Sequence, residues 1–265
     1  MSQTQSSPEV TGNMFLFERP ELLNREQHGA MGLSQIDNPY EFCAKVRAIP
    51  LTITEIPSAS KSFPIVFLSQ EDPVPLAVVG IFDDVNLFVG EDGLWQQGAY
   101  VPGYLRRYPF ALASETGGDR FAIVIDAGHK GVSASPEVKF FDDNGESSDA
   151  TKQALEFCKQ YETDRLRTME IMKILLEKDL VSSQSAQYTP TSGGEPKPFA
   201  GYFGIDEQKL NTLDDEAFLD LRKRGVLPIL YAQLMSLGNW RVIMQMRAER
   251  FNLTEDQLMA QAPIN

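Results

Sequence analysis

The short spacing between strand-like runs in residues 63–95 is the feature that most limits how this chain can fold. Apolar runs occupy 63–69, 74–82 and 86–90, and turn-forming groups such as Glu71-Asp72-Pro73 separate them. A parallel crossover needs a dozen or more connecting residues, whereas antiparallel neighbours can be joined by a tight turn. The spacing therefore predicts an antiparallel β-meander in the N-terminal half.

Flanking segments complete the expected architecture. Further strand-like runs at 45–54 and 121–127 extend the predicted sheet to about 45–127. The C-terminal half has helical periodicity instead, with one long helix or two nearly continuous helices at 149–180. Later helices are predicted at 212–225, 227–237 and 239–250, with a bend near Gly238. We therefore expect an α+β fold in which the N-terminal antiparallel β-meander packs with C-terminal helices.

Local signals predict how several of these segments begin, end and pack. At 212–225 a threonine N-cap, an acidic first turn, a basic last turn and Gly225 delimit a helix. A hairpin turn is predicted around Ser192-Gly193-Gly194. The Met- and Leu-rich stretch 231–240 has helical spacing, so we expect it to be buried rather than presented to a partner. In the long helix, the predicted buried stripe is Leu155, Cys158, Leu166, Met169, Met172, Leu176 and Leu180.

Composition along the chain predicts its domain organisation. Residues 1–13 are rich in Ser, Gln and Thr and predict a mobile tail. Residues 14–250 form the predicted single α+β domain, and 251–265 a polar C-terminal tail. An acidic, turn-rich connection at 141–149 favours the alternative of a subdivision near 145.

The charge balance limits the partners of the chain. It has 37 acidic and 24 basic side chains, a formal net charge of −13, which repels a nucleic-acid backbone. No apolar stretch approaches the roughly 20 residues that a membrane-spanning helix needs. The N-terminus lacks the pattern of a signal peptide, and Cys43 and Cys158 suggest no disulfide framework. We expect a soluble, cytoplasmic protein that binds no nucleic acid. No sequence feature specifies an oligomeric state.

Residues 121–131, FAIVIDAGHKG, resemble the strand and histidine that begin the metal site of zinc-dependent cell-wall amidases. A zinc hydrolase needs three or more protein ligands, but this chain has only His28 and His129, and no histidine follows His129. Phosphate-binding, dinucleotide-binding and Gly-x-Ser-x-Gly motifs are also missing. The sequence therefore predicts no metal, no cofactor and no catalytic residue of a recognised class.

The stretch AYVPGYLRRYPFALA at 99–113 holds the main candidate binding residues. Tyr104 and Tyr108 are spaced i,i+4, and Arg106 and Arg107 lie between them, where a guanidinium can stack on a ring or bind an anion. The simpler alternative is internal pairing of the arginines, with the tyrosines covering the edge of the core. Further candidates are His28, Trp95 and Trp240, which have structural interpretations too.

Several motifs together resemble the SapC family of bacterial proteins. They begin with LLNREQHGAMGL (22–33) and continue through IPLTITEIPSASKSFPIVF (49–67), residues 73–95 and YVPGYLRRYPFAL (100–112). The segments LLEKDLV, GYFGIDEQKLNTL and YAQLMSLGNW follow in the expected order. The resemblance covers most of the chain, roughly 14–250. An unrelated membrane transporter permease shares the name, and the lack of membrane spans excludes that identity.

What this resemblance implies is an accessory role. The family name derives from a surface-layer protein system, and no general catalytic mechanism is attached to it. Relatives are often encoded near outer-membrane receptors, halogenase-like and cupin-like enzymes. We expect a non-catalytic accessory or binding protein that engages a protein partner or a small acidic ligand. The alternatives are an enzyme of unrecognised class using His28 or Cys43 near Arg106 or Arg107, and a surface-layer-associated protein.

Overall fold

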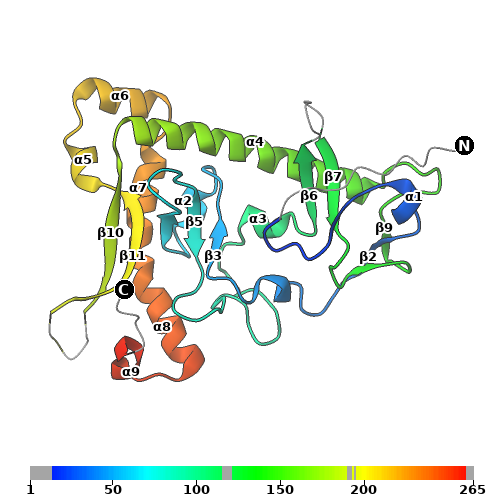
Figure 1. The fold of residues 1–265 in the computed structure, drawn as a ribbon, viewed down its shortest axis with the longest axis horizontal. Coiled ribbons are helices and arrows are strands. Elements are labelled where there is room, and N and C mark those ends of the chain that lie inside the picture. The colour runs from blue at the N-terminus through cyan, green and yellow to red at the C-terminus, as the bar shows by residue number, and fades with distance from the viewer. Residues whose placement is uncertain (1–13, 115–120, 190–192, 194, 261–265) are drawn as a thin grey trace, which may run out of the picture. The chain divides into compact units, whose positions relative to one another are not determined.

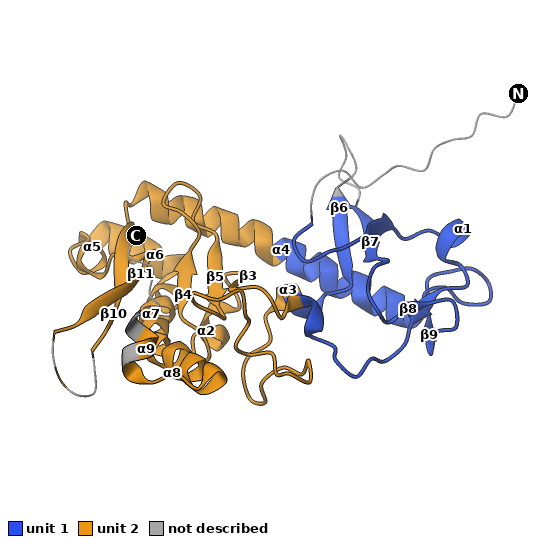
Figure 2. Cartoon of the chain, turned by 60° about the horizontal axis from the view of Figure 1, so that its bottom comes forward, with its two compact units in different colours: residues 1–42, 105–163 blue, residues 43–104, 164–265 orange. Residues whose placement is uncertain are grey.

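The computed structural model describes residues 14–114, 121–189, 193 and 195–260 (Figure 1). The chain divides into two compact units (Figure 2). Unit 1 comprises residues 1–42 and 105–163, and unit 2 comprises residues 43–104 and 164–265. The divisions fall after residues 42, 104 and 163, rather than near 145. The predicted tail 1–13 lies outside the described residues, whereas a short helix, α9 (Glu255–Ala260), occupies part of the predicted C-terminal tail.

Unit 1 contains two small antiparallel sheets. The first has the strand order β1 (Pro20–Leu22), β7 (Phe121–Asp126), β6 (Phe110–Ser114). The second has the order β8 (Val132–Ser133), β2 (Gly32–Leu33), β9 (Val138–Lys139). Strand β7 is central in the first sheet, and its last residues, 124–126, are buried. The sheet therefore carries the end of β7, including a carboxylate, into the interior of the unit.

The core of unit 1 is aromatic. Its main cluster is formed by buried side chains on β6, β7, the segment after β9 and the first half of helix α4 (Asp149–Glu177), namely Phe110, Ile125, Phe140, Phe141 and Cys158. Helix α1 (Arg25–His28) and the 3-10 helix η1 (Glu41–Cys43) complete the N-terminal segment. Of the two forms predicted for 149–180, one long helix or two nearly continuous ones, the structure has the first, and residues 149–163 of α4 belong to this unit.

Unit 2 is built on a five-stranded antiparallel sheet. Its strand order is β10 (Val181–Tyr188), β11 (Lys197–Ile205), β4 (Ile65–Phe67), β5 (Pro75–Val78), β3 (Ala48–Pro50). Strands β4 and β5 are antiparallel neighbours, as their short spacing predicts. Strands β10 and β11 form a hairpin, in which Val181 lies opposite Ile205. Of the predicted turn residues, Ser192 and Gly194 lie outside the described part of the chain.

The α+β class and the antiparallel pairing are confirmed, but the expectation of one sheet over 45–127 is wrong. Strand β7 pairs with β1 and β6 in unit 1. Residues 86–90 form no strand beyond a single bridge between Val89 and Trp95. The Asn86 side chain accepts the N–H of Phe88 and donates to the carbonyl of Cys43. The backbone bonds of this segment are isolated ones, from Leu87 to Val79 and from Gln96 to Phe88.

Helices cover the C-terminal part of unit 2. The N-cap of α6 is Asp214, whose side chain accepts the N–H of Ala217 at 2.7 Å, so the predicted cap at Thr212 is wrong. Gly225 ends this segment with φ +71°, as predicted. No helix in the described ranges is long and apolar enough to cross a membrane. The remaining helices are α2 (Ile56–Ala59), α3 (Gly103–Arg106), α5 (Glu207–Asn211), α6 (Asp215–Lys223), α7 (Leu227–Ser236), the 3-10 helix η2 (Leu237–Asn239) and α8 (Trp240–Phe251).

Two predicted apolar faces are partly exposed. On α4, Leu166 and Met169 are each 47% exposed and Leu176 is 36% exposed, so this part of the expected stripe is wrong. The buried positions there are Thr168, Ile171, Met172 and Leu175, because the helical repeat drifts away from the pattern that begins at Leu155. On α7, the expected burial of the Met-rich stretch also fails at Met235, which is 78% exposed.

Candidate functional site

The predicted Arg–Tyr site is largely a structural feature. The guanidinium of Arg106 lies 5.1 Å from the ring centre of Phe157, and that of Arg107 lies 4.8 Å from the ring centre of Tyr161. Both rings are on α4 within unit 1, so the arginines stack on the chain's own aromatic groups. Tyr104 is half-buried and lies on the same short helix, α3, as Arg106.

Tyr108 contributes to a buried polar cluster around Asp126. Its hydroxyl donates to Asp126 Oδ2 at 2.8 Å, and its ring stacks on Phe42 at 3.8 Å. The carboxylate also accepts the backbone N–H groups of Glu18, Arg19 and Gly128 at 2.8–2.9 Å. Burial raises the pKa of Asp126, but these hydrogen bonds outweigh it and hold the pKa below its ordinary value. Asp126 thus fastens the N-terminal segment to the end of β7.

His129 and His28 have local structural partners. His129 Nδ1 accepts the N–H of Gly131 at 3.1 Å, and burial lowers the pKa of His129 while the charge of Asp126 opposes that shift. His28 is 1% exposed, and its Nε2 lies 3.2 Å from Glu21 Oε2. Within the described chain, no three His, Cys, Asp or Glu side chains are placed to hold a metal ion together.

Cys43 and Trp95 also pack inside unit 2. Burial is the main reason that the pKa of Cys43 rises to about 12. Its thiol is therefore protonated at neutral pH, whereas a nucleophilic cysteine needs the thiolate. The indole of Trp95 is half-buried and stacks on Phe88, with ring centres 5.8 Å apart. Both residues thus have packing roles.

The start of the 99–113 motif closes around a second buried carboxylate, Glu55. Its Oε1 accepts the hydroxyl of Tyr100 and the N–H of Gly103, and its Oε2 accepts the N–H and hydroxyl of Thr52. A Cβ atom at Gly103 would lie only 3.1 Å from Glu55 Oε1, which accounts for glycine there. The motif therefore has a local structural purpose in each unit.

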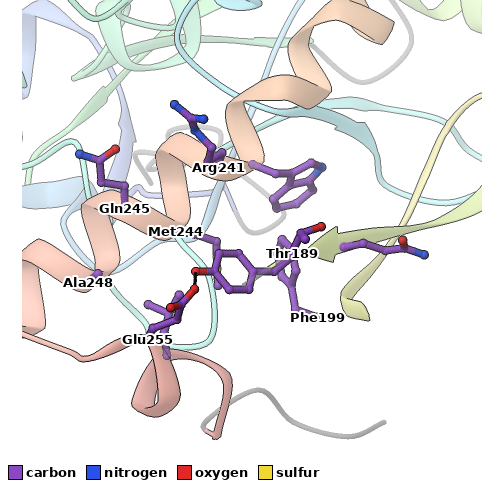
Figure 3. A pocket seen from close by; sticks show the side chains of 11 residues that line it. Thr189, Phe199, Arg241, Met244, Gln245, Ala248 and Glu255 are labelled. Atoms are coloured by element: carbon purple, nitrogen blue, oxygen red, sulfur yellow. Dashed lines mark hydrogen bonds between the residues drawn. The ribbon is translucent and has the colours of Figure 1, made fainter. Parts of the chain in front are cut away.

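The best candidate site is a cavity of about 700 Å³ in unit 2 (Figure 3). Residues of β10, β11, α8 and α9 line it, together with Thr189 after β10. Its volume lies within the roughly 300–1,000 Å³ that small-molecule sites occupy. On α8, Trp240, Met244 and Ala248 recur every four residues and face the cavity, while Arg241 and Gln245 follow one residue later.

The floor of the cavity is apolar and well fixed. Phe199, Trp240, Met244 and Leu258 are all buried and line it. The rings of Trp240 and Phe199 pack edge to face, with their centres 5.6 Å apart. The rings of Trp240 and Tyr202 are tilted to one another, with their centres 5.7 Å apart. Aromatic contacts of this kind restrict the indole to one orientation. The floor can therefore accept a flat apolar group without rearranging.

The polar groups of the cavity lie apart from one another. Tyr188 donates its hydroxyl to Glu255 at 2.5 Å, a bond that is the main cause raising the pKa of Tyr188 to about 12. The buried Nε1 of Trp240 has no hydrogen-bond partner among the described residues. Figure 3 shows Arg241 well separated from Glu255 along the wall. The cavity thus offers a cation, Arg241, away from its carboxylate.

Sequence reasoning found only part of this site. Trp240 was a predicted candidate, whereas Tyr188, Arg241 and Glu255 were not. These residues come from two separate stretches of the chain, 187–199 and 240–258, which only the tertiary structure brings together. The four-residue spacing on α8 is a signal for one wall, but it does not identify the strands opposite.

Comparison with known proteins identifies the family. The SapC family model matches residues 23–243, which is most of the 265-residue chain. The matched range includes Tyr188, Phe199 and Trp240, and it ends before Met244 and Glu255. No curated protein and no solved structure gives a significant match. The extent of the match confirms the resemblance in the sequence motifs, and the chain belongs to the SapC family.

Proposed function

We propose that this protein is a non-catalytic, cytoplasmic accessory protein that binds a small acidic ligand in the cavity of unit 2. A cavity of about 700 Å³ whose wall combines the Arg241 guanidinium with buried apolar side chains is the observation that carries this proposal. Small-molecule sites are mostly apolar and contain a few polar groups that fix the orientation of the ligand. The same combination supports ligand binding at this wall.

The distribution of charge favours an acidic ligand with a flat apolar body. Phe199, Met244 and Leu258 supply the apolar surface on which such a body packs. Arg241 attracts the acidic group, and a guanidinium pairs well with a carboxylate or similar anion. Glu255, already bonded to Tyr188, repels that group and orients it toward Arg241.

The lining residues support binding rather than catalysis. None of the described lining residues is a histidine, cysteine or serine, the usual bases and nucleophiles. With a pKa of about 12, Tyr188 keeps its proton at neutral pH. The enzyme alternative required His28 near Arg106 or Arg107, or a reactive Cys43. His28 instead contacts Glu21 and Asn24, and the Cys43 thiol is buried.

The test uses anilinonaphthalene sulfonate, a fluorescent probe with a flat aromatic body and one anionic group. We expect one probe to bind per folded chain, with energy transfer from tryptophan. The variant Arg241→Gln should weaken probe binding by about tenfold or more, because it removes a charge-assisted hydrogen bond. Trp240→Phe should weaken it less than Arg241→Gln does, because it retains an aromatic side chain in the floor of the cavity.

Arg222→Gln is the matched control, because Arg222 is exposed on α6 and does not line the cavity. Near-UV circular dichroism must show native packing in each variant, since this probe also binds loosely folded proteins. Equal probe affinity in the Arg241 and Arg222 variants would contradict the proposal. Cell fractionation tests the location separately, and recovery in the cell envelope would favour the surface-layer alternative.

A further inference from the structure

Helix α9 forms one wall of the cavity and is bonded across it to the sheet. Glu255 and Leu258 of α9 line the cavity, and Leu258 is only 4% exposed. The hydroxyl of Tyr188 on β10 donates to Glu255, a bond that Figure 3 shows as a dashed line. The docked position of α9 is therefore stabilised by contacts made at the cavity itself.

Local hydrogen bonds cap the two helices that meet at this wall. Helix α8 ends at Asn252, which has a left-handed φ of 50°, and the N–H of Leu253 donates to the carbonyl of Ala248. At the start of α9, the N–H of Thr254 donates to the side chain of Gln257, and the N–H of Gln257 donates to the hydroxyl of Thr254. Each helix end at the junction is thus capped within its own segment.

This junction allows α9 to move as a unit. Hinges are a few residues at the ends of elements that absorb changes in φ and ψ. Leu253 lies between the two caps, so its φ and ψ can change while the bonds of both caps stay intact. Such a movement separates Leu258 from the floor of the cavity and Glu255 from Tyr188.

A bound ligand couples to this movement because Leu258 lines the space that the ligand fills. An apolar body on the floor of the cavity adds contacts to Leu258 that exist only while α9 is docked. A ligand that prefers the docked state shifts the equilibrium toward it, and docking strengthens binding by the same factor. Glu255 is on the moving helix, whereas Arg241 is on α8, so an anionic group at Arg241 lets α9 close without meeting a like charge.

We infer that α9 is a C-terminal clamp, residues 253–260, that closes on the bound ligand. Leu253 is its hinge, Leu258 covers the apolar body of the ligand, and the bond between Tyr188 and Glu255 stabilises the closed position. The inference rests on the proposed ligand binding in this cavity. It adds that one wall of the cavity closes as the ligand binds.

The experiment is hydrogen exchange of the full chain with and without anilinonaphthalene sulfonate, followed by mass spectrometry. In the free chain, residues 253–260 should exchange at least about tenfold faster than residues 243–248 of α8, because α9 opens without global unfolding. Probe at about ten times its dissociation constant should slow exchange in 253–260 by about tenfold, the factor that linkage gives for a ligand that binds only the closed state.

Variants test the two contacts of the clamp separately. Leu258→Ala should release the probe at least about tenfold faster, because it removes the buried apolar contact. Tyr188→Phe removes the bond to Glu255 without altering α9, and it should also speed release. Leu219→Ala is the matched control, because Leu219 is 42% exposed on α6 and does not line the cavity. Near-UV circular dichroism must show native packing in each variant.

The outcomes separate failure of the clamp from failure of the proposed function. If the probe binds and requires Arg241, but exchange in 253–260 does not slow, the clamp is wrong and the binding site stands. Equal release rates in Leu258→Ala and Leu219→Ala overturn the clamp as well. If the folded wild-type chain binds no probe, the proposed function is wrong and the clamp has no ligand to close on.

Discussion

The substitution Asp126→Asn should destabilise unit 1 by about 4 kcal/mol, although it changes almost nothing in side-chain volume. Asp126 Oδ1 accepts the N–H groups of Arg19 and Gly128, and Oδ2 accepts the N–H of Glu18 and the hydroxyl of Tyr108. Asparagine offers one acceptor oxygen and one NH₂ group. With the NH₂ group on the Oδ1 side, the N–H groups of Arg19 and Gly128 would both face a donor. With it on the Oδ2 side, the Tyr108 hydroxyl can turn to accept from it, and only the Glu18 N–H faces a donor. The second orientation is therefore favoured, and the three bonds that it keeps no longer involve a charge.

The magnitude follows from three bonds that lose their charge and one N–H that is left unpaired. A neutral hydrogen bond contributes about 1 kcal/mol less than a charged one, so the three weakened bonds cost about 3 kcal/mol, and the unpaired N–H adds about 1–3 kcal/mol. Tyr108→Phe is the matched comparison, because it removes only one of the four bonds and places no donor against a donor. It should cost about 2 kcal/mol on the same scale.

Urea unfolding followed by far-UV circular dichroism measures both values. With an m value of about 2 kcal/mol/M, the Asp126→Asn midpoint should fall by roughly 2 M. Trp95 and Trp240 both belong to unit 2, so their fluorescence reports that unit separately. If Asp126→Asn costs no more than Tyr108→Phe, the carboxylate does not hold the segment as described.

Three further predictions concern titratable groups. The folded-state pKa of Asp126 is lowered, so the stabilisation from its carboxylate is complete above the unfolded pKa near 3.8 and is lost as pH falls through the folded pKa. Thermal unfolding at low pH should therefore show that the stability of Asp126→Asn falls less steeply with falling pH than that of the wild type. The pKa of Tyr188 is raised to about 12, so the stabilisation from its hydroxyl is present below about pH 10 and is lost as pH rises toward 12. Absorbance titration should find the pKa of Tyr188 returning toward about 10 in Glu255→Gln. Burial holds the pKa values of Cys43 and Cys158 at about 12 and 11, so both thiols should react with a disulfide reagent at pH 8 only after unfolding, and rapid reaction of the native chain would count against this packing.

The sequence predicted features that depend on neighbouring residues. The short connection between β4 and β5 implied antiparallel pairing, and periodicity implied a helical segment at 149–180, as one long helix or two nearly continuous ones. The N-cap of α6 was predicted at Thr212 but lies at Asp214, because both residue types cap helices well. The sequence indicated that the guanidinium of Arg107 could stack on an aromatic ring, and in the structure that ring is Tyr161 of the same chain. Short-range signals thus gave the type of interaction without its partner.

Long-range pairing accounts for what could not be predicted. Strand β11 pairs with β4 through Phe203 and Phe67, residues that no local pattern connects. The cavity depends on the same hairpin, because Tyr188 and Phe199 form one wall and α8 forms another. A periodic pattern specifies which face of a segment is apolar, but it does not specify which segment covers that face. The site therefore became visible only in three dimensions.

The interleaving of the two units governs how the chain can be made and cut. Residues 43–104 of unit 2 are synthesised before residues 105–163, which complete unit 1. Strand β4 therefore has no β11 to pair with until the C-terminal half has been made. Neither unit is a continuous segment, so unit 1 can fold only once residue 163 has emerged, at a time when unit 2 still lacks residues 164–265. A truncation at 145 would remove all of α4 and would leave unit 2 without β10, β11 and the helices α5 to α9. Separate units would have to be made by circular permutation or by joining 1–42 directly to 105–163, rather than by shortening the chain from either end.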